Sequence, residues 1–203
     1  KNIGLTGLNV GQFYDVATDP LDPNWIYGGT QDQGFQRGQI DLDEDTPIAM
    51  EQVISGDYGK IVFSEFGQRM WTVYPGSDFS YYNDPKQGYV DNWETIESEN
   101  EHVWMPAMMA SPDSSGNVIY VGGGSVDGGA GSFIIKLTAD ASTLEVEAEN
   151  LPFDFYNATS GGQLTSLAFS QVDTSRWYAA TENGSFFFSI FYGIRYEVNY
   201  NFF

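Results

Sequence analysis

The sequence predicts an all-β fold, namely a β-propeller with about four blades in this chain, each a four-stranded antiparallel sheet. Glycine supplies 23 of the 203 residues, and glycines and prolines separate short apolar and aromatic runs, as in proteins made of many short strands. No stretch longer than a turn or two keeps the 3.6-residue apolar period of a helix. A unit of strand, polar turn and strand also recurs along the chain, which is typical of propeller blades.

The recurring unit is clearest in the segments 16–29, 109–123 and 167–180, and a weaker copy occupies 61–73. Each copy begins with an apolar run, passes through a polar turn, and ends in a second run with an aromatic residue near its middle. These anchor aromatics are Tyr27, Trp71, Tyr120 and Tyr178. Their positions predict that each lies in the second strand of one blade.

The four blades are predicted at 9–54, 55–98, 99–150 and 151–203. Their strands are expected at 12–18, 24–30, 34–40 and 48–54; at 59–65, 69–75, 78–83 and 92–97; at 105–111, 117–123, 132–138 and 144–149; and at 164–170, 176–181, 185–192 and 194–203. The last of these alternates cleanly, with Ile194, Tyr196 and Val198 on one face and polar residues on the other. Residues 1–8 are expected to form the outer strand of a neighbouring blade or a closing strand.

The blade count indicates that this chain is part of a larger ring. Blades bury their faces against one another, so an open arc of four would expose two apolar faces. We therefore expect a missing segment or another chain to complete the ring.

Several segments carry a family resemblance. Residues 8–14, 19–24 and 26–34, followed by Ser55-Gly-Asp-Tyr-Gly59, resemble the bacterial-neuraminidase-repeat (Asp-box-like) superfamily of β-propellers, which includes sortilin-type and xyloglucan-hydrolase-type repeats. The resemblance covers most of 8–185 and implies a propeller, but it is poor evidence for an activity. The Asp-box itself is degraded: its nearest approach is Asn83-Asp-Pro-Lys-Gln-Gly88 followed by Trp93 at a different spacing.

Charge and composition exclude several partners. The chain has 28 acidic and 8 basic residues, for a net charge of −20, whereas nucleic acid requires a basic surface. No run of 18 apolar residues is present, so we expect no membrane insertion. Cysteine is absent, which excludes disulfides and thiolate chemistry. The acidity, which favours solubility in salt, and the resemblance together indicate a secreted or cell-surface bacterial protein.

Carboxylates are expected to gather on one face of the propeller. On this face lie the connections from one blade to the next and the connections between the second and third strands of each blade. They are Asp32, Asp57, Asp78, Glu99, Glu101, Asp127, Asp154 and Glu182. Paired carboxylates suit glycoside hydrolysis, and Asp32 and Asp57 are the catalytic candidates because each lies in a glycine-flanked turn. The alternative is that these acids are ordinary solvated turn residues.

Other residues of the same face are candidate ligand contacts, either through polar groups or through aromatic rings that stack on sugars. They are Gln31, Tyr58, Asp78, His102, Trp104 and Asp127. His102 is the lone histidine, so a multi-histidine metal site is excluded. The alternative for the aromatic residues is packing between blades.

A weak calcium site is the one candidate cofactor site, and no other cofactor is expected. Asp41, Asp43 and Asp45 alternate as in the opening of a calcium-binding loop. The glycine and glutamate that such a loop needs further on are missing, since Gln52 stands at the glutamate position. A solvated acidic turn is the alternative.

Three functions remain open from the sequence. The first is an extracellular propeller that binds a glycan or a protein ligand on its acidic face. The second is a glycoside hydrolase that uses the mouth carboxylates, so whether the chain is an enzyme is undecided. The third is a structural module of a larger secreted protein without a site of its own.

Overall fold

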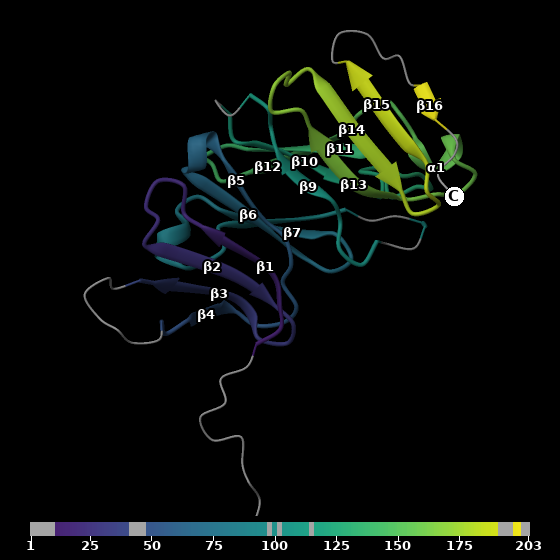
Figure 1. Ribbon diagram of the computed structural model, residues 1–203. Helices are drawn as coiled ribbons and strands as arrows, with labels where there is room; N and C mark the ends of the chain where they lie inside the picture. The colour runs from purple at the N-terminus through teal and green to yellow at the C-terminus, as the bar shows by residue number, and fades with distance from the viewer. Residues whose placement is uncertain are drawn as a thin grey trace, which may run out of the picture.

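The computed structural model describes residues 11–40, 48–96, 99–100, 103–113, 116–190 and 197–199, and these form four antiparallel sheets of four strands each (Figure 1). Every sheet takes its strands in chain order, so each blade is a simple meander. The predicted all-β propeller with four-stranded blades is thereby confirmed.

The strands of the four blades have the following bounds. Blade one contains β1 (Phe13–Thr18), β2 (Trp25–Thr30), β3 (Gly34–Gln39) and β4 (Glu51–Ile54); blade two contains β5 (Ile61–Ser64), β6 (Arg69–Tyr74), β7 (Asp78–Tyr82) and β8 (Asn92–Thr95). Blade three contains β9 (Met108–Ala110), β10 (Val118–Gly122), β11 (Ile134–Ala139) and β12 (Val146–Asn150); blade four contains β13 (Leu164–Phe169), β14 (Arg176–Thr181), β15 (Phe186–Ile190) and β16 (Glu197–Asn199). The short helical turns are η1 (Glu65–Gly67), η2 (Pro85–Gln87) and α1 (Phe155–Ala158).

The blades follow one another along an open arc, with blade one and blade four at opposite ends (Figure 1). Neighbouring blades pack through their inner strands: β1 and β2 contact β5, β5 contacts β9 and β10, and β9 and β10 contact β13. The chain therefore forms a partial propeller.

The apolar core lies between the blades, and the anchor aromatics are part of it. Tyr27 of β2 lies 5.8 Å from Phe63 of blade two, and Tyr120 of β10 lies 4.5 Å from Trp177 of blade four, as ring-centroid distances. Trp71 of β6 belongs to a cluster shared with blade three. The first three anchors thus face the following blade. They hold equivalent positions in their strands, and the side-chain period of two therefore puts them on the same face of each sheet.

A buried polar network also joins blades two and three. The Asn117 side-chain oxygen accepts hydrogen bonds from the Ser64 hydroxyl at 2.6 Å and the Trp71 indole N–H at 3.3 Å. Its amide nitrogen donates to the Tyr81 hydroxyl at 2.7 Å. Because buried polar groups are costly when unpaired, this network specifies how the two blades fit together.

Polar side chains shape the turn between the first two strands of a blade. In blade one the Asp19 carboxylate accepts hydrogen bonds from the backbone N–H groups of Leu21 and Asp22. In blade four the Ser170 hydroxyl accepts from those of Val172 and Asp173. The two turns are equivalent, which explains why the polar turn recurs in the sequence.

Two sequence predictions fall on parts of the chain that the structure does not describe. Residues 1–8, the expected closing strand, lie outside the described residues, and only 197–199 of the expected last strand are described. Within the described ranges, no helix has the length and apolar character that crossing a membrane requires.

Candidate binding pocket between blades one and two

Asp32 and Asp57, the candidate catalytic pair, are brought together by the fold. The Asp57 carboxylate accepts a hydrogen bond from the backbone N–H of Asp32 at 2.7 Å. Asp32 is exposed in the β2–β3 turn, where its φ of 61° is left-handed, and Asp57 lies in the connection from β4 to β5. The contact therefore runs from carboxylate to backbone and holds the turn against the connection.

Three other carboxylates of this face also have hydrogen-bonded structural roles. Asp78 accepts from the Thr95 hydroxyl at 2.6 Å, Glu182 from the Gln163 N–H at 3.1 Å, and Asp154 from the first N–H groups of α1. Asp127 is exposed in the β10–β11 loop. Throughout the described part of the chain, no three acidic or histidine side chains come together as a metal site would need.

Tyr58 is not the exposed stacking surface that the sequence suggested. It is buried, with its ring 6.4 Å from Phe35 and 5.7 Å from Tyr74, and this burial raises the pKa of the Tyr58 hydroxyl to about 12. The reason is that its backbone N–H bonds to the Thr30 carbonyl, which draws the connection into the core between blades one and two.

The remaining candidate ligand contacts are exposed or undescribed. Trp104 is exposed in the connection between blades two and three, and Gln31 is half-buried, with its N–H bonded to the Gln12 carbonyl. His102 and the candidate calcium ligands Asp41, Asp43 and Asp45 lie outside the described residues.

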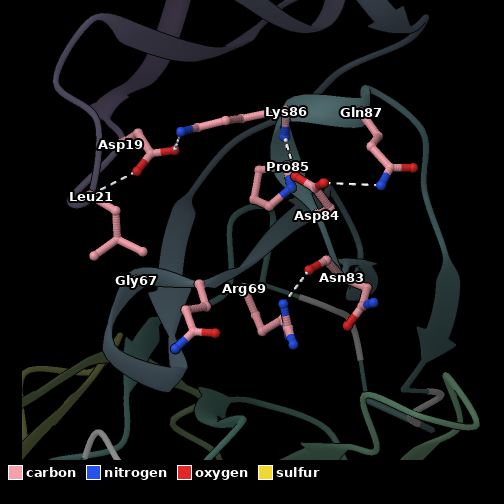
Figure 2. A pocket seen from close by; sticks show the side chains of 10 residues that line it. Asp19, Leu21, Gly67, Arg69, Asn83, Asp84, Pro85, Lys86 and Gln87 are labelled. Carbon is pink, nitrogen blue, oxygen red and sulfur yellow. Dashed lines mark hydrogen bonds and ion pairs between the residues drawn. The ribbon is translucent and has the colours of Figure 1, made fainter.

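A pocket of about 370 Å³ opens on the opposite face of the propeller, between blades one and two (Figure 2). Three connections supply its walls: the β1–β2 turn, the η1 turn leading into β6, and η2 between β7 and β8. The lining residues are Asp19, Leu21, Gly67, Gln68, Arg69, Asn83, Asp84, Pro85, Lys86 and Gln87.

One wall of the pocket is built around Lys86. Its ammonium nitrogen lies 3.0 Å from the Asp22 carboxylate and 3.7 Å from that of Asp19, and the hydrogen bond to Asp22 raises the pKa of Lys86. Asp84 caps η2 by accepting from the Lys86 backbone N–H at 3.1 Å and also accepts from the Gln87 amide at 2.9 Å. Blade one and blade two are thus joined across the pocket by charge.

The second wall is built around Arg69. Its guanidinium donates to the Asn83 carbonyl at 2.7 Å and forms an ion pair with Glu65 at 3.0 Å. Arg37 lies behind the pocket, where it pairs with Glu51 and donates to the Lys86 carbonyl. Three of the chain's eight basic residues therefore gather here, each bound to a carboxylate.

Two exposed apolar residues, called the rim below, belong to the turns that form the pocket. Leu21 is 61% exposed and Phe66, next to the lining residue Gly67, is 60% exposed. The η1 turn has positive φ angles at Glu65, Phe66 and Gly67, so two non-glycine residues hold a strained backbone there. Gly67 lies so close to blade one that a Cβ on it would meet Pro20 at 2.9 Å.

Sequence reasoning placed the ligand face on the other side of the ring and did not nominate these pocket residues. Two segments noted above did contain pocket residues: 83–88, the nearest approach to an Asp-box, which forms the η2 wall, and 19–24, which includes Asp19 and Leu21. The rest of the pocket depends on two blades meeting, which local sequence patterns do not encode.

The chain matches no protein-family model, and no curated protein is similar to it in sequence. Solved structures do resemble it. The structure of Chaetomium thermophilum Sqt1 superimposes with a TM-score of 0.57 at 19% identity, covering 88% of this chain and 44% of that one. The β-propeller domain of Myceliophteria thermophila Cps50 (Swd1) superimposes with a TM-score of 0.64 at 13% identity, and the match covers 92% of this chain and 59% of that one.

The chain therefore spans about half the length of these structural relatives. They are WD40-type propellers, so they do not support the neuraminidase-repeat type that the sequence suggested. At such low identity the likeness establishes the fold alone, which is that of a β-propeller.

Proposed function

We propose that this chain is a β-propeller interaction module that binds a protein ligand at the pocket between blades one and two. The observation that carries the proposal is the combination of a concave polar site with two exposed apolar residues, Leu21 and Phe66, in the turns that form it. Interfaces are typically organised in this way, with a few apolar anchors beside well-placed polar groups.

The apolar rim supplies a source of binding energy. Full burial of a leucine or phenylalanine side chain is worth roughly 1.5–3 kcal/mol each. Leu21 and Phe66 come from neighbouring turns that Gly67 and Pro20 hold in contact, so a ligand would meet a pre-organised surface.

The charge of the chain selects the kind of partner. The basic groups at the pocket are already paired with carboxylates, and the whole chain carries a charge of −20. The negative electrostatic field of a chain with this charge speeds the encounter with a basic protein and repels acidic proteins. We therefore expect a partner segment with apolar side chains and basic residues.

The glycan ligand, the glycoside hydrolase and the secreted or cell-surface bacterial location are further proposals. They rest on the charge, the exposed Trp104, the turn carboxylates Asp32 and Asp57, and the family resemblance. The glycan and hydrolase alternatives enter the test as competing outcomes.

The test selects displayed random peptides on the intact chain and probes a glycan array in parallel. The double variant Leu21→Ser, Phe66→Ser removes the rim. Val172→Ser is the matched control, because Val172 is almost fully exposed at the equivalent turn position of blade four.

We expect the selected peptides to be rich in Lys or Arg and apolar residues, and to lose at least about tenfold in affinity for the double variant, a difference of about 1.4 kcal/mol. Binding to the Val172→Ser control should be unchanged. Peptides that bind the double variant as tightly as the unmodified chain would contradict the pocket, and binding of glycans alone would favour the carbohydrate alternative.

A further inference from the structure

Within the described residues, the sheet faces at the two ends of the arc have no neighbouring blade. The apolar residues of the blade-one end face are Phe13, Val16, Ile26, Ile48 and Met50, and those of the blade-four end face are Ala168, Tyr178, Ala180, Phe186 and Phe188. The strand register also places the polar residues Thr18, Gln36 and Gln52 on the first face and Ser166 on the second.

The residues of the blade-one end face cover the sheet. A Cβ added at Gly28 would lie 2.5 Å from the Phe13 ring, and one added at Gly38 would meet Met50 at 2.7 Å and Ile48 at 2.8 Å. Glycine in these strands thus lets apolar side chains lie flat on the sheet. The result is a group of apolar side chains packed on the side of blade one that faces away from blade two.

The strand register shows that this is an interblade surface without its partner. Val16, Ile61 and Met108 hold equivalent positions, since each pairs with the residue that follows the anchor aromatic of its blade. Ile61 and Met108 pack against the preceding blade and are each 9% exposed, whereas Val16 is 56% exposed. Burial at this position therefore requires a preceding blade.

The blade-four end face is an interblade surface that lacks a following blade. Phe79 and Phe186 are equivalent, because each pairs with the residue two positions after the anchor aromatic. Phe79 faces blade three and is 1% exposed, whereas Phe186 is 41% exposed and stacks only on Tyr178, at 6.1 Å, among the described rings. Tyr178 itself is the fourth anchor, and its three counterparts each face a following blade.

We infer that the blade-four end face of one copy of this chain packs against the blade-one end face of a second copy, so that two copies close an eight-bladed ring. The two end faces are the two halves of one repeated interface, so each is the surface that fits the other. A two-fold axis then creates two identical junctions and leaves no open face. Eight blades lie within the usual size range of closed propellers, about four to eight.

The match covers 59% of the Swd1 propeller domain, so a ring of that kind contains more blades than the four that the structure describes. A single copy cannot close on itself, because blades one and four lie at opposite ends of the arc (Figure 1). This inference concerns surfaces other than the pocket and stands or falls separately from the proposed ligand.

The first experiment measures the mass of the chain in solution by sedimentation equilibrium at about 0.15 M salt, where repulsion between the acidic copies is screened. We expect twice the 22.6 kDa of one chain. Val16→Glu and Phe186→Glu should each raise the dimer dissociation constant at least about thirtyfold, because every ring contains both junctions. Val172→Glu is the control and should leave the mass unchanged.

The second experiment identifies the junction by cross-linking, for which the absence of cysteine gives a clean background. Tyr120 of blade three contacts Trp177, the residue immediately before the anchor aromatic of blade four. The equivalent residue of blade one is Ile26, so Tyr178 should face Ile26 of the other copy. A mixture of Ile26→Cys and Tyr178→Cys chains should give a covalent dimer with a short bis-maleimide. Neither variant should do so alone.

Several results would overturn the inference. They are a folded monomer at concentrations of about 0.1 mM, a dimer unaffected by both glutamate variants, or a cross-linked product from either single variant alone. Open-ended polymers would also overturn it, because they would mean that the head-to-tail contact forms without closing a ring of two.

Discussion

The carboxylate of Asp57 accepts a 2.7 Å hydrogen bond from the backbone N–H of Asp32, which ties the strand connection leading into blade two to a turn of blade one. Gln33 and Gly56 form an isolated bridge beside it. An acidic residue at position 57 therefore has a structural role, because it satisfies an N–H in a left-handed turn.

This relationship predicts different outcomes for two substitutions of Asp57. Asp57→Ala should lower the free energy of unfolding by about 1 kcal/mol, since it removes the acceptor. Asp57→Asn should cost less, because its side-chain oxygen still accepts. Urea denaturation of both variants measures the difference. An unchanged free energy of unfolding for Asp57→Ala would mean that the hydrogen bond contributes nothing.

The same variant separates the structural role from the hydrolase alternative. If Asp32 and Asp57 were a catalytic pair, Asp57→Asn and Asp32→Asn would each abolish hydrolysis of a plant or algal polysaccharide while leaving the fold intact. Turnover that is equal in the variants and the unmodified chain would remove both residues as catalytic candidates.

The β2–β3 turn also predicts a large effect at Gly34. A Cβ there would lie 1.7 Å from the Ile54 carbonyl oxygen, in addition to the cost of a φ of +76°. Gly76→Ala is the matched control, with a φ of +90° and no atom within 4 Å of the added Cβ. We expect Gly76→Ala to lower the free energy of unfolding by about 1–2 kcal/mol and Gly34→Ala to lower it by clearly more. Urea denaturation measures both losses. Equal costs would contradict the close packing of β3 on the connection after β4.

Asn117 should be important for the junction of blades two and three. Asn117→Ala removes the acceptor of the Ser64 hydroxyl and the donor to Tyr81, all in buried surroundings, and should cost about 2–4 kcal/mol. Asn92→Ala removes one partly buried hydrogen bond to the Leu144 carbonyl between the same blades, together with an exposed one from the Trp93 N–H, and should lower the free energy of unfolding by about 1 kcal/mol. Thermal and chemical denaturation measure both losses of stability. A larger loss for Asn92→Ala than for Asn117→Ala would show that the network does not hold the blades together.

Glu94 predicts a specific pH dependence. Burial raises the pKa of the Glu94 carboxyl above its ordinary value of 4.5, so the folded state holds the proton more tightly than the unfolded chain does. The resulting contribution to stability is complete below pH 4.5 and is lost as the pH rises through the folded-state pKa. Glu94→Gln should therefore raise the denaturation midpoint at neutral pH, and its advantage should shrink on acidification. A constant difference across this range would contradict the prediction.

Much of the blade architecture was predictable because it follows from local patterns. In blade one the first three strands were expected at 12–18, 24–30 and 34–40, and β1, β2 and β3 begin within one residue of those ranges. The fourth was expected from residue 48, but β4 begins at Glu51. Turn chemistry at Asp19 and Ser170 and the side-chain period of two in strands are properties of neighbouring residues, so they are visible in the sequence.

The sites were less predictable because they depend on contacts between distant residues. Tyr58 lies in a glycine-rich loop by sequence, yet the Thr30 carbonyl draws its backbone into the core. Lys86 meets Asp22 only because blades one and two stand side by side. No local pattern distinguishes these residues from ordinary loop residues.

The amino-acid sequence by itself determined that this protein is a row of four-stranded blades, because strand period and turn composition act over a few residues. Only the tertiary structure decided which loops face each other, where the pocket lies, and that the two ends of the arc retain apolar faces. These features depend on side chains from different blades meeting in space, and that meeting is set by how whole sheets pack.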